Sequence, residues 1–303
     1  IVGEGLNARA EVTDFWAMVF NPSSVDRLLH VWIGSFLAGA FLVLSVNAYY
    51  ILKKRHLNIA KPAFKIALLV ATVFSVAQLF MGHRSADGVS KNQPAKLAAL
   101  EGHYDSTAVA DMYLFGWVNN ETQTTTGLKI PGGLSFLIHG DFEKEVIGLN
   151  AFNPEDRPTQ VNAIFQFYHL MVAIGLALIA LTLYASWQWR KGKLFDKRWL
   201  MSIFVWSVLL PQIANQVGWF AAEMGRQPWV VYGHLRTSDA LSKAVSANQI
   251  LFSLILFVLV YSTLFVLFLY LLNKKIKHGP DDDSAPEPIG DGSKRINPFL
   301  KQS

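Results

Sequence analysis

The chain has 303 residues, of which 52% are hydrophobic, 13% aromatic and only 16% charged, a balance far from that of an average soluble domain. It contains no cysteine, which excludes disulfides, thiolate metal sites and iron–sulfur clusters. The net charge of +5 does not indicate nucleic-acid binding, because the basic residues cluster beside apolar runs, where they indicate membrane topology instead.

Five segments are long and apolar enough to span a bilayer, which takes roughly 20 residues for each span. In chain order they cover residues 28–52, 63–82, 161–187, 199–222 and 249–272. The sequence therefore predicts an all-α membrane protein with five transmembrane helices. Pro211 should kink the fourth of these helices, because proline lacks a backbone N–H and its ring crowds the preceding turn.

Basic clusters predict how the spans are oriented. The stretches "KKRH" at 53–56, "RKGKLFDKR" at 190–198 and "NKKIKH" at 273–278 all follow or precede spans on the same side. Lysine and arginine are enriched in cytoplasmic loops, so this side is expected to be the cytoplasm.

This orientation predicts four parts of the chain. Residues 1–82 hold an outer N-terminal segment and the first two spans, and 83–160 form a long outer loop. Residues 161–272 hold the other three spans, and 273–303 form a cytoplasmic tail. The tail is rich in Pro, Gly and Asp and is expected to be disordered.

Three residues within the spans could ligate a metal. His30 should lie roughly 10 Å into the first span, and His169 and Met171 roughly 12–15 Å into the third. Both spans enter from the outer side, so His30 and Met171 reach similar depths. An imidazole and a thioether at one depth suit the two axial positions of a low-spin haem. Taken alone, each residue is also consistent with ordinary helix packing.

The fourth span carries polar and charged groups on its way outward. Trp219 and Glu223 are four residues apart and share one helix face. Glu223 should reach the outer boundary, at the level of His30 and Met171. Glu223 has two interpretations. It could simply form a salt bridge with Arg226, one turn later, or it could take part in redox chemistry beside a haem layer. A polar stripe lies on the same helix, formed by Gln212, Asn215 and Gln216.

Three blocks of sequence resemble subunit I of the cytochrome bd quinol oxidases. "GWFAAEMGRQPWVVYGHLRTSDALS" at 218–242 is similar to the signature of that subunit. "KLAALEGHY" at 96–104 resembles the start of its quinol-binding loop, and "VFNPSSVDRLLHVWIGSFLAGAFLVLSVNAYYIL" resembles its fifth transmembrane helix. The resemblance covers nearly the whole chain in the same order. It implies that the five spans correspond to the last five of a nine-helix subunit.

The resemblance implies a role for each candidate in the spans. His30 and Met171 match the two axial ligands of a low-spin haem b, and Glu223 matches the carboxylate ligand of a high-spin haem b. Trp219 matches an aromatic residue placed between haems. Arg226 matches a basic residue that faces haem propionates.

The resemblance also implies roles in the outer loop. Lys96 and Glu101 match a pair implicated in quinol oxidation, whereas without the resemblance they would form a charge pair on a solvated loop helix. His169 stands where the family usually has arginine, which leaves its contact with a haem propionate open. The remaining histidines of this loop are expected at the surface: His83, His103 and His139.

The implied function is that of a quinol:oxygen oxidoreductase of a bacterial or archaeal plasma membrane. It would take electrons from quinol outside, pass them through haems and reduce oxygen to water, building a membrane potential without pumping. A third haem, d or b, would be shared with a four-span N-terminal portion. The chain begins at Ile1, just before the family's fifth span, so a truncated or split-gene version is expected. A second oxidase subunit and a small single-span subunit are the other expected protein partners.

Two other functions fit a membrane protein of this composition. One is a haem-poor structural or assembly subunit of a membrane respiratory complex, which the presence of His30, Met171 and Glu223 argues against. The other is a transporter whose Glu and Arg residues handle ions. The sequence shows neither the repeat symmetry nor the paired broken helices that are typical of many transporters.

Overall fold

The computed structural model describes residues 11–241 and 244–280, and these fall into two compact units that meet in the sequence at Ala244–Val245. Five helical segments are long and apolar enough to cross a membrane, which confirms the predicted class of membrane protein with five spans. They are α2 (Ser24–Leu52), α3 (Leu57–Asn92), α6 (Val161–Arg190), the consecutive helices α7 (Arg198–Trp206) and α8 (Leu209–Gly225), and α9 (Ala247–His278). A short helix, α1 (Phe15–Val19), precedes them.

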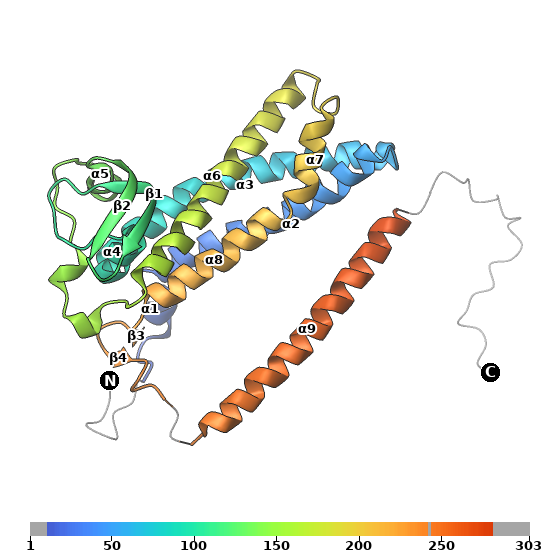
Figure 1. Cartoon of the computed structure of the whole chain (residues 1–303). Helices are drawn as coiled ribbons and strands as arrows, with labels where there is room; N and C mark the ends of the chain where they lie inside the picture. The colour runs from blue at the N-terminus through green and yellow to red at the C-terminus, as the bar shows by residue number, and fades with distance from the viewer. Residues whose placement is uncertain (1–10, 242–243, 281–303) are drawn as a thin grey trace, which may run out of the picture. The chain divides into compact units, whose positions relative to one another are not determined.

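The first four of these segments form a closed bundle (Figure 1). α2 packs against α3, α7 and α8, while α6 packs against α3 and α8. α2 and α6 therefore occupy opposite sides of the bundle, and groups on them can face each other across its interior.

The connectors at one end of the bundle lie together, as the charge pattern predicts. The ring of Phe64 on α3 packs edge-on against Phe195 of the α6–α7 connector, with ring centroids 5.9 Å apart. Lys65 lies over Trp189 and Phe195, 5.8 Å from each centroid. The basic stretches 53–56 and 190–198 thus share one end of the first unit, which we call the basic end.

The fourth span is broken near Pro211, as the sequence predicts. α7 ends at Trp206 and α8 begins at Leu209, because the proline ring excludes the carbonyl of Ser207, four residues earlier, from a regular helix. The hydroxyl of Ser45 on α2 donates a hydrogen bond of 2.6 Å to the carbonyl of Val205 at this break. The break is therefore fastened to the neighbouring helix.

The segment predicted as a long loop is folded at the other end of the bundle (Figure 1). α3 continues to Asn92, ten residues beyond the span predicted at 63–82. It is followed by α4, an antiparallel hairpin, a short helix and two 3-10 turns; these are α4 (Pro94–Glu101), β1 (Met112–Asn119), β2 (Thr124–Ile130), α5 (Gly133–His139), η2 (Leu149–Ala151) and η3 (Pro154–Asp156). A two-stranded ribbon, β3 (Trp229–Val231) and β4 (Leu235–Arg236), follows α8. We call this end the α4 end.

Helix α4 begins and ends where its sequence allows. Pro94 occupies the first turn, where a missing N–H costs nothing, and Gly102 follows in the left-handed region with φ of 61°. Every residue from Ala95 to Glu101 is buried. Their apolar neighbours form a core shared by α4, α6, α8 and β1: Tyr104, Val118, Leu149, Val161, Ile164, Phe165 and Ala221.

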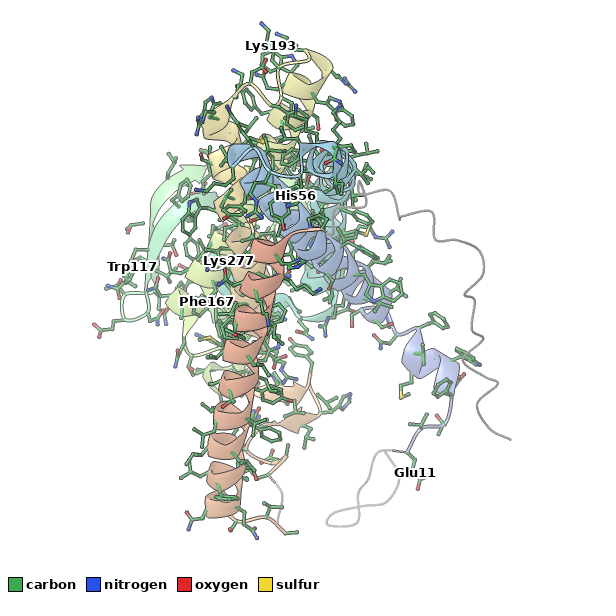
Figure 2. All side chains as sticks on the ribbon, turned by 90° about the vertical axis from the view of Figure 1, so that its right-hand side faces the viewer. Glu11, His56, Trp117, Phe167, Lys193 and Lys277 are labelled. Carbon is green, nitrogen blue, oxygen red and sulfur yellow. The ribbon has the colours of Figure 1, made fainter. Side chains whose placement is uncertain are left out.

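Helix α9 belongs to the second unit and is described by itself. It begins with a capping box, in which the side chains of Ser246 and Gln249 cap each other's backbone. Its side chains over 250–272 are mostly apolar and project on all sides (Figure 2). The helix ends at His278, so the tail predicted from residue 273 is helical over its first six residues. The predicted disorder of 281–303 lies outside the described residues.

Candidate functional site

His30 and Met171 lie at the same level of the bundle. Two contacts align the antiparallel helices α2 and α8: Ser45 bonds to Val205, and the amide of Asn215 lies 3.5 Å from the carbonyl of Gly34. Gly218 of α8 is therefore level with residue 31 of α2, one residue from His30. Because the sulfur of Met171 packs on Gly218, the two predicted axial ligands differ in level by about one residue, ~1.5 Å.

His30 faces α3 rather than open space. Nε2 of Gln78 lies 3.1 Å from Nε2 and 3.3 Å from Nδ1 of the imidazole. Oε1 of Gln78 is buried without a hydrogen-bond partner among the described residues. Gln78 is not among the residues predicted from the sequence, although an amide inside the apolar run "FSVAQLFMG" is a signal of a functional position.

The position opposite Met171 is occupied by a glycine, and any larger residue there would displace the thioether. A β-carbon at Gly218 would lie 2.5 Å from the sulfur of Met171, which is closer than van der Waals contact allows. The thioether therefore rests directly on the backbone of α8. Gly175, one turn farther along α6, has no heavy atom within 4 Å of the same hypothetical β-carbon.

Glu223 and Arg226 form the salt bridge that the simpler of the two interpretations predicts. Nη2 of Arg226 lies 2.6 Å from Oε2 of Glu223, and both side chains are half-exposed. Glu223 is five residues beyond Gly218, which places it about 8 Å nearer the α4 end than Met171. The expectation that Glu223 shares one level with His30 and Met171 is therefore wrong by about one and a half helical turns. Trp219 lies between the two levels and is exposed on the open face of α8.

Lys96 is buried against the end of α8. Only 7% of its surface is exposed, and its ammonium donates a hydrogen bond of 3.0 Å to the carbonyl of Ala222. Burial, together with the positive charges of Arg27 and Arg226, lowers the pKa of Lys96 to about 8, while Glu223 opposes this effect. The interpretation of a solvated charge pair is wrong for this residue.

Glu101 is more deeply enclosed than Lys96. Its exposed fraction is 2%, and burial raises the pKa of its carboxyl to about 7, with a hydrogen bond from Tyr168 of α6 acting in the opposite direction. Oε2 has no hydrogen-bond partner among the described residues. Tyr168 is not predicted from the sequence, because an aromatic residue in an apolar span carries no signal of a polar partner.

His169 points away from the level of Met171. Its Nδ1 lies 2.9 Å from the carbonyl of Phe165, and its Nε2 lies 2.7 Å from the carbonyl of Tyr113 in β1. The imidazole also stacks on the ring of Phe165, with centroids 3.8 Å apart. The structure therefore places His169 as a link between α6 and the hairpin. Of the other loop histidines, His103 is half-buried rather than at the surface.

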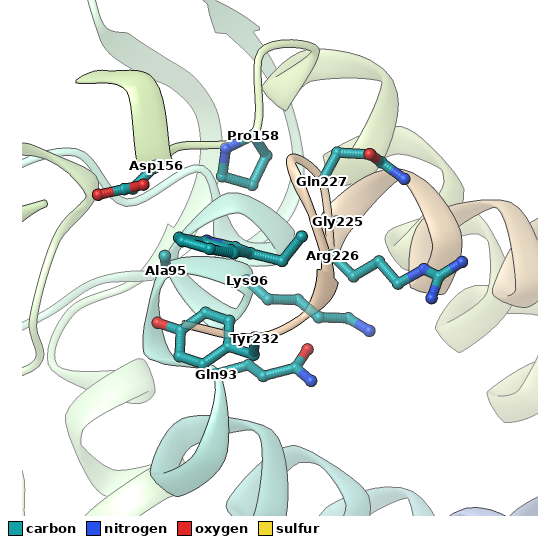
Figure 3. A pocket seen from close by; sticks show the side chains of 10 residues that line it. Gln93, Ala95, Lys96, Asp156, Pro158, Gly225, Arg226, Gln227 and Tyr232 are labelled. Carbon is teal, nitrogen blue, oxygen red and sulfur yellow. The ribbon is translucent and has the colours of Figure 1, made fainter. Parts of the chain in front are cut away.

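A shallow hollow in the surface lies beside Lys96. In Figure 3 the side chains of Lys96 and Arg226 extend in the same direction along it. The rings of Trp229 and Tyr232 meet edge to face, 6.1 Å apart, in its wall. Nε of Arg226 is buried without a hydrogen-bond partner among the described residues. The hollow thus combines flat apolar surface with two cationic donors.

The described residues fit a haem in several respects. His30 and Met171 stand on opposite helices at one level, and the orphaned Oε1 of Gln78 shows that the polar groups around His30 are incompletely satisfied. Glu223 offers a carboxylate on the open face of α8, where Arg226 holds it. Imidazole and thioether groups are common ligands of haem iron in proteins. The carboxylate is a ligand type that the family resemblance implies.

The chain is similar to known proteins over most of its length. A family model described as cytochrome bd terminal oxidase subunit I matches residues 2–280. The cytochrome bd ubiquinol oxidase subunit 1 of Bacillus subtilis (strain 168) is 32% identical over 288 residues, which cover 92% of this chain and 62% of that protein. The cytochrome bd-II ubiquinol oxidase subunit 1 of Escherichia coli (strain K12) is 28% identical over 346 residues, covering 92% and 67%.

A solved structure is similar over the same region. The bd oxidase from Geobacillus thermodenitrificans aligns with a TM-score of 0.79 at 29% identity, covering 88% of this chain and 61% of the other. The chain thus spans about three fifths of the length of this structure and of the Bacillus relative. Because the family model matches residues 2–280 of the 303, the chain belongs to the cytochrome bd terminal oxidase subunit I family.

Proposed function

We propose that this chain is a haem-binding subunit of a terminal quinol oxidase that reduces oxygen to water. The observation that carries the proposal is the burial of Lys96 and Glu101 in α4, at the end of the bundle where α8 presents Glu223 and Arg226. Burying two ionisable side chains is costly, and both pKa values are shifted toward neutrality. Such an arrangement is typical of residues that move protons.

The chain's own residues suggest how quinol would be handled. Oxidation of a quinol to a quinone releases two electrons and two protons. The flat ring of the substrate would lie against Trp229 and Tyr232, and Lys96 would stabilise the anion formed when a hydroxyl loses its proton. Glu101, five residues farther along α4, would accept the proton and release it toward water.

Bound haem would supply the one-electron carriers that accept electrons from quinol. His30 and Met171 would hold a low-spin haem b, and Glu223 would ligate a high-spin haem b beside Trp219. A third haem, d or b, would be shared with further protein, together with a second oxidase subunit and a small single-span subunit. The difference in level between Met171 and Glu223 supports two separate sites.

The proposed activity fixes an orientation for the chain. Residues 83–160 would form the quinol-binding part outside the membrane, and the basic end would face the cytoplasm, as would the C-terminus. Protons from quinol would be released outside, whereas those used to form water would be taken from the cytoplasm. This separation would generate a membrane potential without a pump.

The test is to compare Glu101→Gln with Glu121→Gln in the assembled oxidase. Both residues lie between α3 and α6, but Glu121 is exposed at the β1–β2 turn. We expect Glu101→Gln to lower quinol oxidase turnover severely and to leave the dithionite-reduced haem spectrum unchanged, with Glu121→Gln normal in both. Normal quinol turnover in Glu101→Gln would refute the quinol site, and a complex without a haem α-band would refute the haem-binding role.

A further inference from the structure

The β1–β2 hairpin has one buried and one exposed face. Val118 is buried and Gly116 lies close to the ring of Phe165, so this face packs on α6. Phe115 and Leu128 are paired across the strands on the other face, and Trp117 follows two residues after Phe115. Between 62% and 65% of each of these three side chains is exposed, and Figure 2 shows Trp117 at the edge of the molecule. We call Phe115, Trp117 and Leu128 the hairpin patch.

Three polar contacts fix the hairpin along α6. The backbone N–H of Val118 donates to Oδ1 of Asn162, and the amide of Gln166 donates to the carbonyl of Gly116 at 2.7 Å. Nε2 of His169 lies 2.7 Å from the carbonyl of Tyr113. These contacts run over seven residues of α6, about 10 Å, so the depth of the hairpin is set by a membrane-spanning helix.

The length of α6 places the hairpin patch relative to the bilayer. Trp187 lies half-exposed near the basic end, and the ammonium of Lys191 lies over its ring, 3.8 Å from the centroid. Such a pair of residues is suited to a membrane interface. Gln166 is twenty-one residues from Trp187, about 31 Å along the helix axis. The hydrocarbon core of a bilayer is ~30 Å thick. Gly116, between Phe115 and Trp117, therefore lies at the level of the opposite interface.

The α6 face that carries the hairpin is continuous with an apolar surface of the span. Asn162, Gln166 and His169 follow a seven-residue repeat, and the same face continues toward the basic end. Its next large side chains, Leu176 and Leu183, are exposed and apolar. The hairpin patch thus lies at one end of an apolar surface, where the membrane meets water, and the rest of that surface lies within the membrane.

We propose that the hairpin patch inserts into the boundary between headgroups and hydrocarbon of the lipid bilayer, and so anchors the α4 end to the membrane surface. Aromatic side chains are enriched at this boundary. The charged groups of the hairpin are kept off the patch: Lys129 is paired with Asp111 at 2.6 Å, and Glu121 is at the turn. The anchor does not depend on the proposed oxidase function, although it would hold Lys96 where a lipid-soluble substrate arrives.

The absence of cysteine from the chain makes the test direct. Single variants Phe115→Cys and Trp117→Cys would be spin-labelled in the assembled complex in lipid nanodiscs, with the unsubstituted complex as the labelling background. Collision rates with oxygen, which concentrates in lipid, and with a water-soluble nickel chelate would be measured. Glu121→Cys, at the turn of the same hairpin, is the water-exposed control, and an unchanged elution volume in size-exclusion chromatography would confirm folding and assembly.

We expect the ratio of oxygen to nickel-chelate collisions at 115 and 117 to exceed the ratio at 121. Leu176→Cys, on the same face of α6 but deeper, should give a higher ratio still. Equal ratios at 115, 117 and 121 would show that the patch lies in water and would overturn the proposal. Protection of 115 and 117 from both reagents would also overturn it, because another protein would then cover the patch.

Discussion

The pKa of Glu101 is shifted by burial rather than by a neighbouring charge. Burial raises the pKa of its carboxyl to about 7, and the only opposing effect is a hydrogen bond from Tyr168. A carboxyl group with a pKa near 7 is divided between its two protonation states at neutral pH, so it can both take and release a proton. An ordinary surface glutamate would hold a proton too weakly for this role.

The pKa of Glu101 predicts how quinol oxidation depends on pH. Only the deprotonated carboxylate can accept a proton, and raising the pH through about 7 produces it. We expect kcat/KM for quinol to rise with pH up to about 7 and to fall above about 8, where Lys96 loses the charge that stabilises the quinol anion. The measurement is a pH profile of oxygen uptake by the assembled oxidase. Glu101→Gln should remove the rising limb, and a limb that persists in this variant would assign it to another group.

Tyr168 should tune this profile without being required for folding. Tyr168→Phe removes the hydrogen bond that lowers the pKa of Glu101, so the rising limb should move to higher pH. Tyr113→Phe is the matched control, because its hydroxyl donates to the carbonyl of Thr125 within the hairpin instead. An identical shift in both variants would mean that loss of packing, not the contact with Glu101, moves the profile.

The contact between Met171 and Gly218 allows the axial-ligand assignment to be tested without replacing a ligand. In Gly218→Ala the new methyl group would lie 2.5 Å from the sulfur, so Met171 must move. We expect a shifted or partly high-spin haem spectrum and an altered reduction potential. Gly175→Ala adds the same methyl group to α6 where nothing lies within 4 Å, and its spectrum should be unchanged. An unchanged spectrum in Gly218→Ala would contradict ligation by Met171.

At the scale of elements, local sequence predicted the spans and missed the layer at the α4 end. Apolar length and the position of Pro211 are local properties, so the five spans and the break before α8 could be predicted. The stretch 94–101 could be predicted as a helix from Pro94 and Gly102. Its complete burial could not, because the covering residues come from α6, α8 and β1, far away in the sequence.

The break between α7 and α8 is expected to depend on its fastening to α2. Ser45→Ala removes the donor to the carbonyl of Val205 and should destabilise the bundle by about 0.5–1.5 kcal/mol. Ser35→Ala is the control on the same helix, since its hydroxyl bonds to Val31 within α2. Thermal unfolding in detergent would measure both. Equal melting temperatures for the two variants would show that the contact between helices adds nothing.

At the scale of the whole molecule, the candidate site is divided over two levels. The sequence predicted the matched depth of His30 and Met171, because each position is counted from the start of its own helix. It placed Glu223 on the same level, because the boundary of the fourth span was counted without knowing where α8 meets α2 and α6. Pairing between helices sets such offsets, and a single sequence does not contain that information.

The open face of α8 leads to a prediction about the assembled oxidase. One face of α8 carries four polar or aromatic side chains at helical spacing: Gln212, Gln216, Trp219 and Glu223. The first three of them are exposed in the first unit. Amide groups are costly in contact with lipid tails, so this face should be covered by protein or by a bound group. A spin label attached at Gln216→Cys before the complex is assembled should therefore be shielded from lipid and from water in the assembled complex.

Leu183→Cys on α6 provides the matched comparison for Gln216→Cys, because its apolar side chain suits direct contact with lipid. A spin label at 183 should collide freely with oxygen, whereas a label at 216 should be protected from both oxygen and a water-soluble nickel chelate. The protection at 216 should be lost when the complex is dissociated, since the amide face is then uncovered. If the label at 216 in the intact complex collides with oxygen as freely as the one at 183, the polar face lies in lipid. The electron-transfer site would then have to be sought on another face of α8.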